Sequence, residues 1–344
     1  MPGKNTGKAK HQVKKRTWIR AAIICVIAAA ALIAGIILLN SSEDSQYAEK
    51  RGKMTEGFGQ LKTVEIGGVK YREKPAVTTL LICGIDVPTE AEDISEAKYR
   101  SAGPADFLML LGIDHTDKKI HQLQIDRDTM TEIDILGIFG NEVGTRVWQI
   151  CLSHCYGATP QDNAKYTVRA VDRLLGGVQI DGYYMIDYTA MGTINDALGG
   201  VPVKIGFDME HINPEWKKGA TVTLHGDEAQ TFVRTRMTVG AGTNEERMVR
   251  QNEFMSSAIR CMNKKISADI GFGEALLTKL QSLSTSNMTT KRLAEELVQA
   301  HKYEILPVEH PEGEYKIGED GYMEFHMKEG AAVQWVLDHM YSRE

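Results

Sequence analysis

The sequence predicts an α/β domain with a central mixed, largely buried β-sheet, flanked by helices on both faces and preceded by a single N-terminal transmembrane helix. Three observations support this prediction. Apolar runs of strand length recur along the chain, amphipathic helical segments separate them, and a much longer apolar run stands near the N-terminus. With 344 residues, 42% of them hydrophobic and 25% charged, the chain is long enough for one large domain or two ordinary ones.

The N-terminal segment has the composition of a membrane anchor. Residues 1–20 contain seven basic side chains and no acidic one, and 21–39 is an uninterrupted apolar run of 19 residues. That length spans a bilayer core as a helix, and the basic flank indicates a cytoplasmic N-terminus. A cleaved signal peptide is the alternative, but its apolar core is usually shorter and no clean A-x-A site follows the run. We therefore expect a cytoplasmic tail over 1–20, a transmembrane helix over 21–39, a juxtamembrane stalk over 40–60 and an extracellular C-terminal domain in a single-pass cell-membrane protein.

Composition excludes two classes of site. When the seven cations of the tail are removed from the total of 40, residues 21–344 hold 33 basic against 46 acidic side chains, a formal charge of −13. Nucleic acid is therefore a poor partner for the exported part, because affinity for it depends on neutralising phosphates. The five cysteines include no CxxC pair and no zinc-type spacing, so a structural zinc site is not expected. Cys151 and Cys155 are one helical turn apart, and a disulfide between them stays open.

Strand and helix signals alternate along the exported part. A Gly67-Gly68 turn between two alternating segments predicts a hairpin, and near-continuous apolar runs predict strands buried on both faces. The expected strands and hairpins cover 63–72, 77–83, 107–113, 119–125, 183–187, 201–205 and 315–325. The expected helices cover 145–156, 159–175, 188–198, 225 onward, 244–265, 272–283, 289–300 and 328–341. We divide this part into a catalytic domain over 61–265 and a C-terminal helical and hairpin extension over 266–344.

Arginines gather around a glycine-rich turn in the segment FVRTRMTVGAGTNEERMVRQ. Helical spacing puts three of its side chains on one face, those of Arg247, Arg250 and Gln251. Two more, Arg234 and Arg236, share a face if their segment is extended. Since the planar guanidinium fork binds phosphate with two hydrogen bonds, this pattern indicates a ligand with more than one negative charge. A solvated, charged helix face is the plain alternative.

Acidic side chains stand at the ends of the apolar strands. Asp86 follows the first strand and Asp106 begins the second, and open α/β sheets bind ligands in crevices at strand ends. Two carboxylates with open positions are typical of Mg²⁺, although each could simply cap its strand. After the third strand, Arg127 lies between Asp126 and Asp128. Either the two acids neutralise this arginine, or it points into the same crevice and Asp128 orients it.

Six motifs occur in a characteristic order. They read LLICGIDVP, PADFLMLLGID, KKIHQLQIDRDT, YYMIDYTAMGTINDALGGVPV, LHGDEAQTFVRTR and ERMVRQNEF, and they cover roughly 77–265. This order, behind such an anchor, resembles the LytR-CpsA-Psr family of cell-wall glycopolymer ligases. The resemblance implies an exported α/β domain that binds a polyprenyl-pyrophosphate-linked glycan and transfers the phosphorylated glycan to peptidoglycan, with Mg²⁺ at the pyrophosphate.

The resemblance also implies roles for single residues. The arginine of the family's P-R-D segment corresponds to Arg127, its V-R-x-R pair to Arg234 and Arg236, and its R-x-x-R-Q helix to the segment from Arg247. The resemblance further implies that the carboxylates of Asp86 and Asp106 bind the Mg²⁺ ion. The catalytic group would be Arg127, Asp128, Arg234 and Arg236. The phosphate-binding group would be Arg127, Arg234, Arg236, Arg247, Arg250 and Gln251.

The chain departs from the family pattern at four places. Val87 follows Asp86 where an arginine is often near, and Pro104-Ala105-Asp106 stands for R-S-D. Asp126 replaces the proline of P-R-D, and Gln149-Ile150-Cys151 stands for K-I-N. The site thus loses up to three basic groups and gains one acid beside its key arginine.

Three functions are open on this basis. The first is a phosphotransferase that attaches a teichoic acid or capsular polysaccharide to peptidoglycan, with pyrophosphatase activity as a side reaction. The second is a non-catalytic, membrane-anchored binder or regulator of polyprenyl-phosphate lipids, which the missing basic groups motivate. The third is an exported structural protein without a lipid ligand, which the recurrence of the arginines disfavours. The expected partners are the lipid-linked glycan, peptidoglycan and the membrane, and the general base stays open between Asp126 and Asp128.

Overall fold

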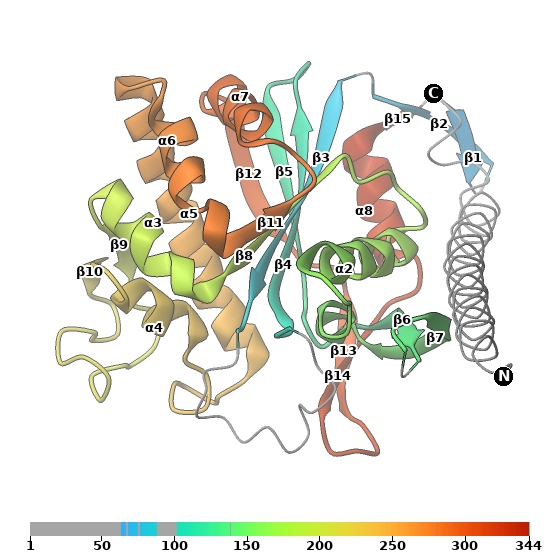
Figure 1. Ribbon diagram of the computed structural model, residues 1–344, viewed down its shortest axis with the longest axis horizontal. Coiled ribbons are helices and arrows are strands. Elements are labelled where there is room, and N and C mark those ends of the chain that lie inside the picture. Colours follow the sequence, from blue (N-terminus) through green and yellow to red (C-terminus); the bar gives the residue numbers. More distant parts are fainter. Residues whose placement is uncertain (1–62, 67, 75, 88–101, 138, 344) are drawn as a thin grey trace, which may run out of the picture. The chain divides into compact units, whose positions relative to one another are not determined.

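The computed structural model describes residues 63–66, 68–74, 76–87, 102–137 and 139–343 (Figure 1). These residues belong to one compact unit, Gly57–Glu344. The expected tail, transmembrane helix and stalk lie outside the described residues. Within the described ranges, no helix has both the length and the hydropathy that a membrane span requires.

A six-stranded sheet forms the centre of the domain, with the strand order β11–β8–β3–β4–β5–β12. Its strands are β3 (Val77–Ile85), β4 (Ala105–Asp114), β5 (Lys119–Ile125), β8 (Gly182–Asp187), β11 (Ser284–Ser286) and β12 (Glu304–Glu309). β3 pairs antiparallel with β4 and parallel with β8, and β5 pairs antiparallel with β4 and parallel with β12. The predicted mixed sheet and the predicted β4–β5 hairpin are therefore confirmed.

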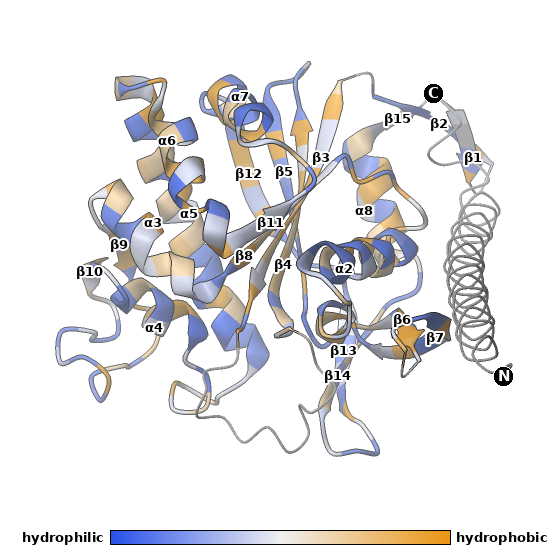
Figure 2. Cartoon of the chain, in the orientation of Figure 1, coloured by the Kyte–Doolittle hydropathy of each residue, from blue (hydrophilic) through white to orange (hydrophobic). Residues whose placement is uncertain are grey.

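Helices cover both faces of this sheet, as Figure 1 shows. On one side lie α2 (Pro160–Leu174) and α8 (Ala331–Met340), together with the short 3-10 helix η2 (Ile150–His154). On the other side lie α3 (Met191–Leu198), α5 (Asn244–Ala268), α6 (Phe272–Lys279) and α7 (Thr290–Ala300). The central strands carry hydrophobic residues in Figure 2, because both of their faces are covered. The main core joins Leu81, Leu108 and Leu123 of the sheet to Val171 of α2 and Val336 of α8.

Smaller elements surround the sheet. A second core forms around the hairpin of β9 (Val201–Lys204) and β10 (Thr221–Leu224), where Phe232 of α4 (Glu228–Arg234) packs against Phe254 of α5. β1 (Thr63–Ile66) and β2 (Val69–Glu73) form the predicted hairpin, which β15 (Tyr341–Arg343) extends. A short 3-10 helix, η3 (Tyr188–Ala190), leads from β8 into α3.

The predicted helix over 145–156 is wrong. Its first part, 145–149, belongs to β7 (Glu142–Gln149), which pairs with β6 (Met130–Leu136), and only the short 3-10 helix η2 after it is helical. Val143, Val147 and Trp148 have side chains that suit a pleated surface, so pairing with β6 prevails over the weak helical periodicity. β6 itself was not expected from the sequence.

The expected C-terminal extension completes the same domain. It supplies two strands of the central sheet, β11 and β12, and the helices α6, α7 and α8 that cover it. The hairpin expected between 315 and 325 is confirmed as β13 (Gly313–Ile317) and β14 (Met323–Met327). This hairpin lies beside β6 and β7 in Figure 1, below the edge of the sheet where the acidic segments meet.

Candidate active site

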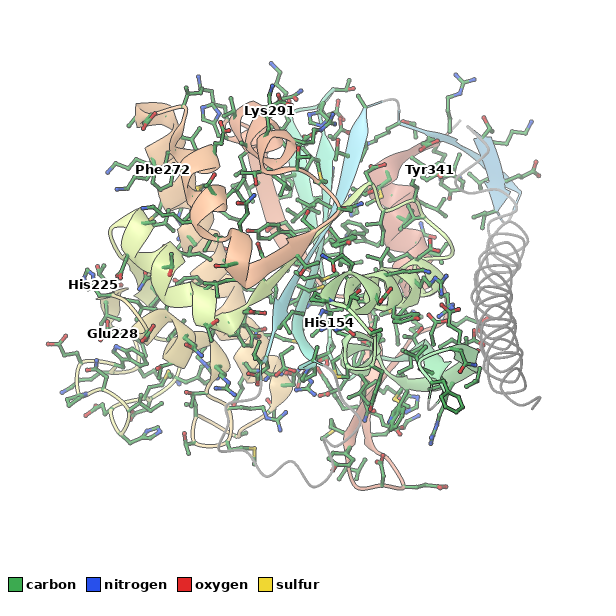
Figure 3. The ribbon with its side chains drawn as sticks, in the orientation of Figure 1. His154, His225, Glu228, Phe272, Lys291 and Tyr341 are labelled. Carbon is green, nitrogen blue, oxygen red and sulfur yellow. The ribbon has the colours of Figure 1, made fainter. Side chains whose placement is uncertain are left out.

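Three acidic segments meet at one edge of the central sheet. Because β4 runs antiparallel to both β3 and β5, it begins where those two strands end. This register brings Asp86, Asp106 and Arg127 to the same edge, as the sequence predicted. His154, labelled in Figure 3, lies at this edge, and its Nδ1 is 3.0 Å from the carbonyl oxygen of Gly103, which fixes the segment that leads into β4.

A β-bulge in β4 places Asp106. Gly84 pairs with Phe107 and Ile85 pairs with Ala105, so Asp106 is an additional residue with no partner on β3. A bulge interrupts the strict alternation of a strand and re-aims the side chain at that position. The Asp106 carboxylate is thereby separated from the apolar side chains on either side of it.

Asp106 joins two arginines from distant parts of the chain. Its Oδ1 lies 2.6 Å from Nη1 of Arg127, and its Oδ2 accepts a hydrogen bond from Nη1 of Arg247 at 2.8 Å. Asp106 and Arg247 are 5% and 4% exposed, so this pair is shielded from solvent. Since the loss of one partner leaves a buried charge uncompensated, the three side chains depend on one another.

Asp86 holds a third arginine. Nη2 of Arg234 lies 2.9 Å from Oδ1 of Asp86, and Nε of Arg234 donates a hydrogen bond to Oδ2 at 3.3 Å. A guanidinium offers the same two-point geometry to phosphate. Arg234 is the last residue of α4, and Thr235 is the C-cap, so the condition under which Arg234 and Arg236 would share a face, an extended segment, is not met. Arg234 and Arg236 are consequently placed differently. Arg236 lines a cleft with Arg127, and no carboxylate in the described ranges forms an ion pair with it.

Helix α5 aims two of its polar side chains at the sheet. Arg247 and Gln251 are four residues apart and face the same way, Arg247 toward Asp106 and Gln251 toward β5 and η3. The amide of Gln251 donates to Oη of Tyr188 at 3.2 Å and accepts from Nε2 of Gln124 at 3.3 Å. Gln251 therefore stands between the charged cluster and the apolar interior.

Arg250 has a structural role that was not expected. Its guanidinium donates to the backbone carbonyl oxygens of Phe232 at 3.1 Å and Glu246 at 3.2 Å, and to that of Thr235. These contacts fasten the end of α4 to α5 and engage Nε, Nη1 and Nη2. Three of the five guanidinium donors are thereby engaged, and phosphate binding by Arg250, implied by the resemblance, stays a prediction. Arg250 also positions the segment that carries Arg234.

Asp126 does not neutralise Arg127. Its Oδ1 accepts hydrogen bonds from Nδ2 of Asn244 at 2.9 Å and from the backbone N–H of Asp128 at 2.7 Å, and its Oδ2 accepts the hydroxyl of Tyr315. A carboxylate with so many donors is held as a structural acceptor. The acid that replaces the family's proline therefore stabilises the turn after β5, and it is a poor general base.

Asp128 has one engaged and one unengaged oxygen. Its Oδ1 lies 3.2 Å from Nε of Arg127, while Oδ2 is buried and accepts no hydrogen bond from the described residues. Burial raises the pKa of Asp128 to about 6, against the lowering effect of Arg127 and with a further rise from Asp126. Such a carboxylate changes protonation state near neutral pH, as a general base must.

Cys151 contacts the central arginine but is not a nucleophile. Nη2 of Arg127 lies 3.2 Å from its Sγ, and burial raises the pKa of the thiol to about 11. A thiol with that pKa stays protonated at neutral pH. It is unbridged, so the disulfide with Cys155 that the spacing left open is not formed.

An apolar cavity of about 290 Å³ lies between the sheet and helices α3, α5, α6 and α7. Its walls include Ile82 of β3, Phe107 of β4, Ile259 of α5, Leu276 of α6 and Leu297 of α7. Gln251 and Tyr188 also line it, and Gln251 is one helical turn from Arg247. Because Phe107 follows Asp106 directly, the cavity begins beside the charged cluster.

Asp86 and Asp106 suit a hard cation such as Mg²⁺ only when a bound ligand supplies further oxygen atoms. Asp86 and Asp106 offer oxygen donors, and Mg²⁺ typically takes one or two carboxylates and completes its shell with phosphate oxygens and water. Oδ1 of Asp106 is buried and receives no well-aligned hydrogen bond from the described residues, although Arg127 is close. Among the same residues no cluster of three or more metal-binding side chains occurs. The donor set thus fits Mg²⁺ shared with a phosphate.

Sequence reasoning missed the cavity. Its signal is the apolar stripe Met255, Ile259 and Met262 on α5, at helical spacing, which is equally typical of an ordinary core. Only the position of α6 and α7 shows that this stripe borders a cavity.

Comparisons with known proteins agree with this architecture. The LytR_cpsA_psr family profile matches residues 36–334. The chain is 28% identical over 182 residues to the polyisoprenyl-teichoic acid–peptidoglycan teichoic acid transferase TagU of Halalkalibacterium halodurans, a stretch that covers 53% of this chain and only 52% of that relative. It is 25% identical to the TagU protein of Bacillus cereus, over 71% of this chain and 68% of that protein.

A solved structure shares the fold. The crystal structure of B. subtilis TagV superimposes with a TM-score of 0.55 and 19% sequence identity, over 78% of this chain and 98% of that one. At this identity the likeness concerns the fold alone. The central mixed sheet with helices on both faces is therefore a shared architecture.

Proposed function

The chain belongs to the LytR_cpsA_psr family, and from this premise we propose that it is a membrane-anchored extracellular phosphotransferase. It moves a phosphorylated glycan from a polyprenyl-pyrophosphate lipid to a hydroxyl group of peptidoglycan. The TagU relatives are named as teichoic acid transferases, which supports teichoic acid as the glycan class. The anchor rests on the apolar run over 21–39, outside the described residues.

The apolar cavity beside the arginines carries this proposal. A polyprenyl pyrophosphate has a long hydrocarbon chain and a doubly phosphorylated head, and the site offers an apolar cavity that begins where guanidinium groups gather. Burial of the chain is favourable in proportion to the apolar area removed from water, and the arginines neutralise the head. Gln251 and Tyr188 stand where the two parts of the lipid would join.

The arginines of the site would stabilise the negative charge of the phosphate groups. In phosphoryl transfer the protein mainly positions the reactants and stabilises charge on the transferred phosphoryl group and the leaving oxygen. Arg127 and Arg236 border the cleft and would hold the transferred phosphoryl group, while Arg234 and Arg247 would hold the departing lipid phosphate. Mg²⁺, held by Asp86 and Asp106, would neutralise further negative charge on the pyrophosphate.

In the proposed reaction one phosphorus–oxygen bond forms, another breaks, and one proton is transferred. The acceptor oxygen forms a bond to the glycan-side phosphorus, and the bond from that phosphorus to the bridging oxygen breaks. Polyprenyl phosphate leaves with the bridging oxygen. The acceptor proton passes to Oδ2 of Asp128, the buried oxygen that accepts no hydrogen bond from the described residues. Water in place of the acceptor would give the pyrophosphatase side reaction.

Turnover by the full-length protein tests the proposal. We expect detergent-solubilised protein to release polyprenyl phosphate from a glycan-pyrophosphate lipid and to attach the glycan to added peptidoglycan, in a manner that depends on Mg²⁺. Chelation with EDTA should stop both, and re-addition of Mg²⁺ should restore them. Tight lipid binding without release of polyprenyl phosphate would instead support the non-catalytic binder.

A pH profile tests the role of Asp128. A base must be deprotonated, so the transfer rate should rise with pH up to the pKa of about 6 and then level off. In the Asp128→Asn variant the rate should fall by about 10²-fold and this rising limb should vanish. The matched control is Asp338→Asn, an exposed acid on α8. An unchanged acidic limb in Asp128→Asn would assign the proton to another group.

A further inference from the structure

The C-terminal hairpin is fastened to the turn that carries the central arginine. The backbone N–H of Phe325 donates to the carbonyl oxygen of Asp128 at 2.8 Å, and Thr129 and Phe325 form an isolated parallel bridge. On the other strand of the hairpin, Tyr315 donates its hydroxyl to Asp126. Because both strands contact the same turn, residues 126–129 between β5 and β6, the hairpin tip has a defined position relative to Arg127.

This position creates a second recess, which we name the hairpin cleft. It has a volume of about 520 Å³ and is distinct from the apolar cavity. Arg127, Asp128 and Arg236 line it. So do Trp148 and Gln149 at the end of β7, Tyr156 after η2, and Asp320, Tyr322 and Met323 at the hairpin tip.

The hairpin cleft has the surface chemistry of a carbohydrate site. Aromatic side chains from three segments line it, Trp148 of β7, Tyr156 after η2 and Tyr322 of the hairpin tip, and the Arg146 guanidinium lies 4.6 Å from the centre of the Trp148 ring. Two other lining residues each carry a side-chain oxygen without a partner among the described residues. Oε1 of Gln149 and Oδ2 of Asp128 are buried and accept no hydrogen bond from the described residues. Sugar rings combine apolar faces with hydroxyl donors, so they match rings interspersed with acceptors.

The hairpin cleft and the apolar cavity both adjoin the charged cluster. Pro104, just before β4, lines the hairpin cleft, Phe107 of β4 lines the apolar cavity, and Asp106 lies between these two residues in the sequence. In an in-line displacement the attacking oxygen approaches opposite the leaving oxygen. If the lipid phosphate leaves toward the apolar cavity, the acceptor hydroxyl enters from the side of the hairpin cleft.

We propose that the hairpin cleft binds the sugar rings of the acceptor glycan, with Tyr322 and Trp148 as packing surfaces. This inference rests on the proposed transferase function and deepens it. It gives the C-terminal hairpin a role, namely to select the acceptor. Asp128 then lines the cleft that the acceptor hydroxyl enters.

Substitutions in the hairpin cleft test this assignment. In full-length protein, Tyr322→Ala and Trp148→Ala should each raise KM for soluble N-acetylglucosamine–N-acetylmuramic acid oligosaccharides by about fivefold to tenfold, the loss typical of a contributing interface aromatic. KM for the lipid donor should stay within about twofold, because the apolar cavity is untouched. Tyr322→Phe keeps the ring and should keep the parental value. Ile317→Ala, on the same hairpin and 74% exposed, is the matched control.

The outcomes separate this inference from the transferase function itself. Transfer by the parent with an unchanged acceptor KM in both variants would overturn the inference and leave the function standing. A rise in the donor KM instead would assign the cleft to the donor glycan and also overturn it. If the parent transfers nothing, calorimetric binding of the same oligosaccharides decides: weaker binding by Tyr322→Ala than by Ile317→Ala supports a sugar site, and equal or absent binding overturns it.

Discussion

Arg127→Ala is expected to lower kcat for glycan transfer by about 10²- to 10³-fold, the range found when one well-placed donor to a transition state is removed. Arg127 lies 2.6 Å from Asp106, 3.2 Å from Asp128 and 3.2 Å from the thiol of Cys151, so its guanidinium is held in place from three sides. A cation held in place in this way stabilises the negative charge that develops in the transition state without having to reorient. The measurement is single-turnover release of polyprenyl phosphate.

Two further variants separate chemistry from folding in this prediction. Arg127→Ala leaves the Asp106 and Asp128 carboxylates with less compensating charge, so a loss of stability accompanies the loss of rate. Arg127→Lys retains the charge but loses the planar fork, and we expect an intermediate rate with near-parental Tm. Arg260→Ala, an exposed arginine later on α5, should behave as the parent. Parental rates in a folded Arg127→Ala protein would contradict the proposed mechanism.

The central strands could be predicted from the sequence because their signals are local. Val77–Ile85 and Ala105–Asp114 are mostly apolar, which is typical of strands covered on both faces, and a short polar link joins the latter to β5. The β6–β7 pair could not be predicted in the same way. β7 has seven of its eight residues at least partly exposed, so its strand conformation depends on pairing with β6 rather than on its own pattern.

The place where the candidate site residues meet was predictable, but the contacts of each one were not. Strand order brings Asp86, Asp106 and Arg127 to one edge, and motif order selected the arginines. Helical spacing, however, assigned Arg250 to the phosphate, whereas the structure engages it with carbonyl oxygens at the end of α4. Such a contact depends on how two helices meet, which spacing within one helix does not encode.

Long-range contacts explain the remaining differences. Tyr315 and Asp126 are 189 residues apart, and their hydrogen bond turns an apparent extra charge beside Arg127 into a structural acceptor. The bulge at Asp106 likewise requires knowledge of its pairing with β3. The C-terminal hairpin lay outside the recognised motifs, and its contacts with distant residues such as Asp128 and Asp126 connect it to the site.

Ala258→Phe is expected to weaken binding of a long-chain polyprenyl phosphate by at least about tenfold, since each buried methylene contributes about 0.8 kcal/mol. Ala258 lines the apolar cavity and lies seven residues beyond Gln251 on α5, which corresponds to about 10 Å along the helix axis. A phenyl ring there would occupy part of a cavity of about 290 Å³ and exclude the distal isoprene units. Equilibrium binding of the lipid, followed by calorimetry in detergent, measures the effect.

Chain length provides the control that identifies where the lipid lies. Geranyl phosphate has the same phosphate head and a ten-carbon chain that ends near Ala258, so its affinity should change by less than about threefold in Ala258→Phe. Ala275→Phe places the same ring at an exposed position of α6 and should affect neither ligand. Because the ring fills existing space, the loss of folding free energy should not exceed about 1–3 kcal/mol, the usual cost of overpacking a core. The fall in Tm should be correspondingly small. If a folded Ala258→Phe protein bound both lipids as the parent does, the hydrocarbon chain would have to lie outside this cavity, and the arginines alone would account for recognition of the head.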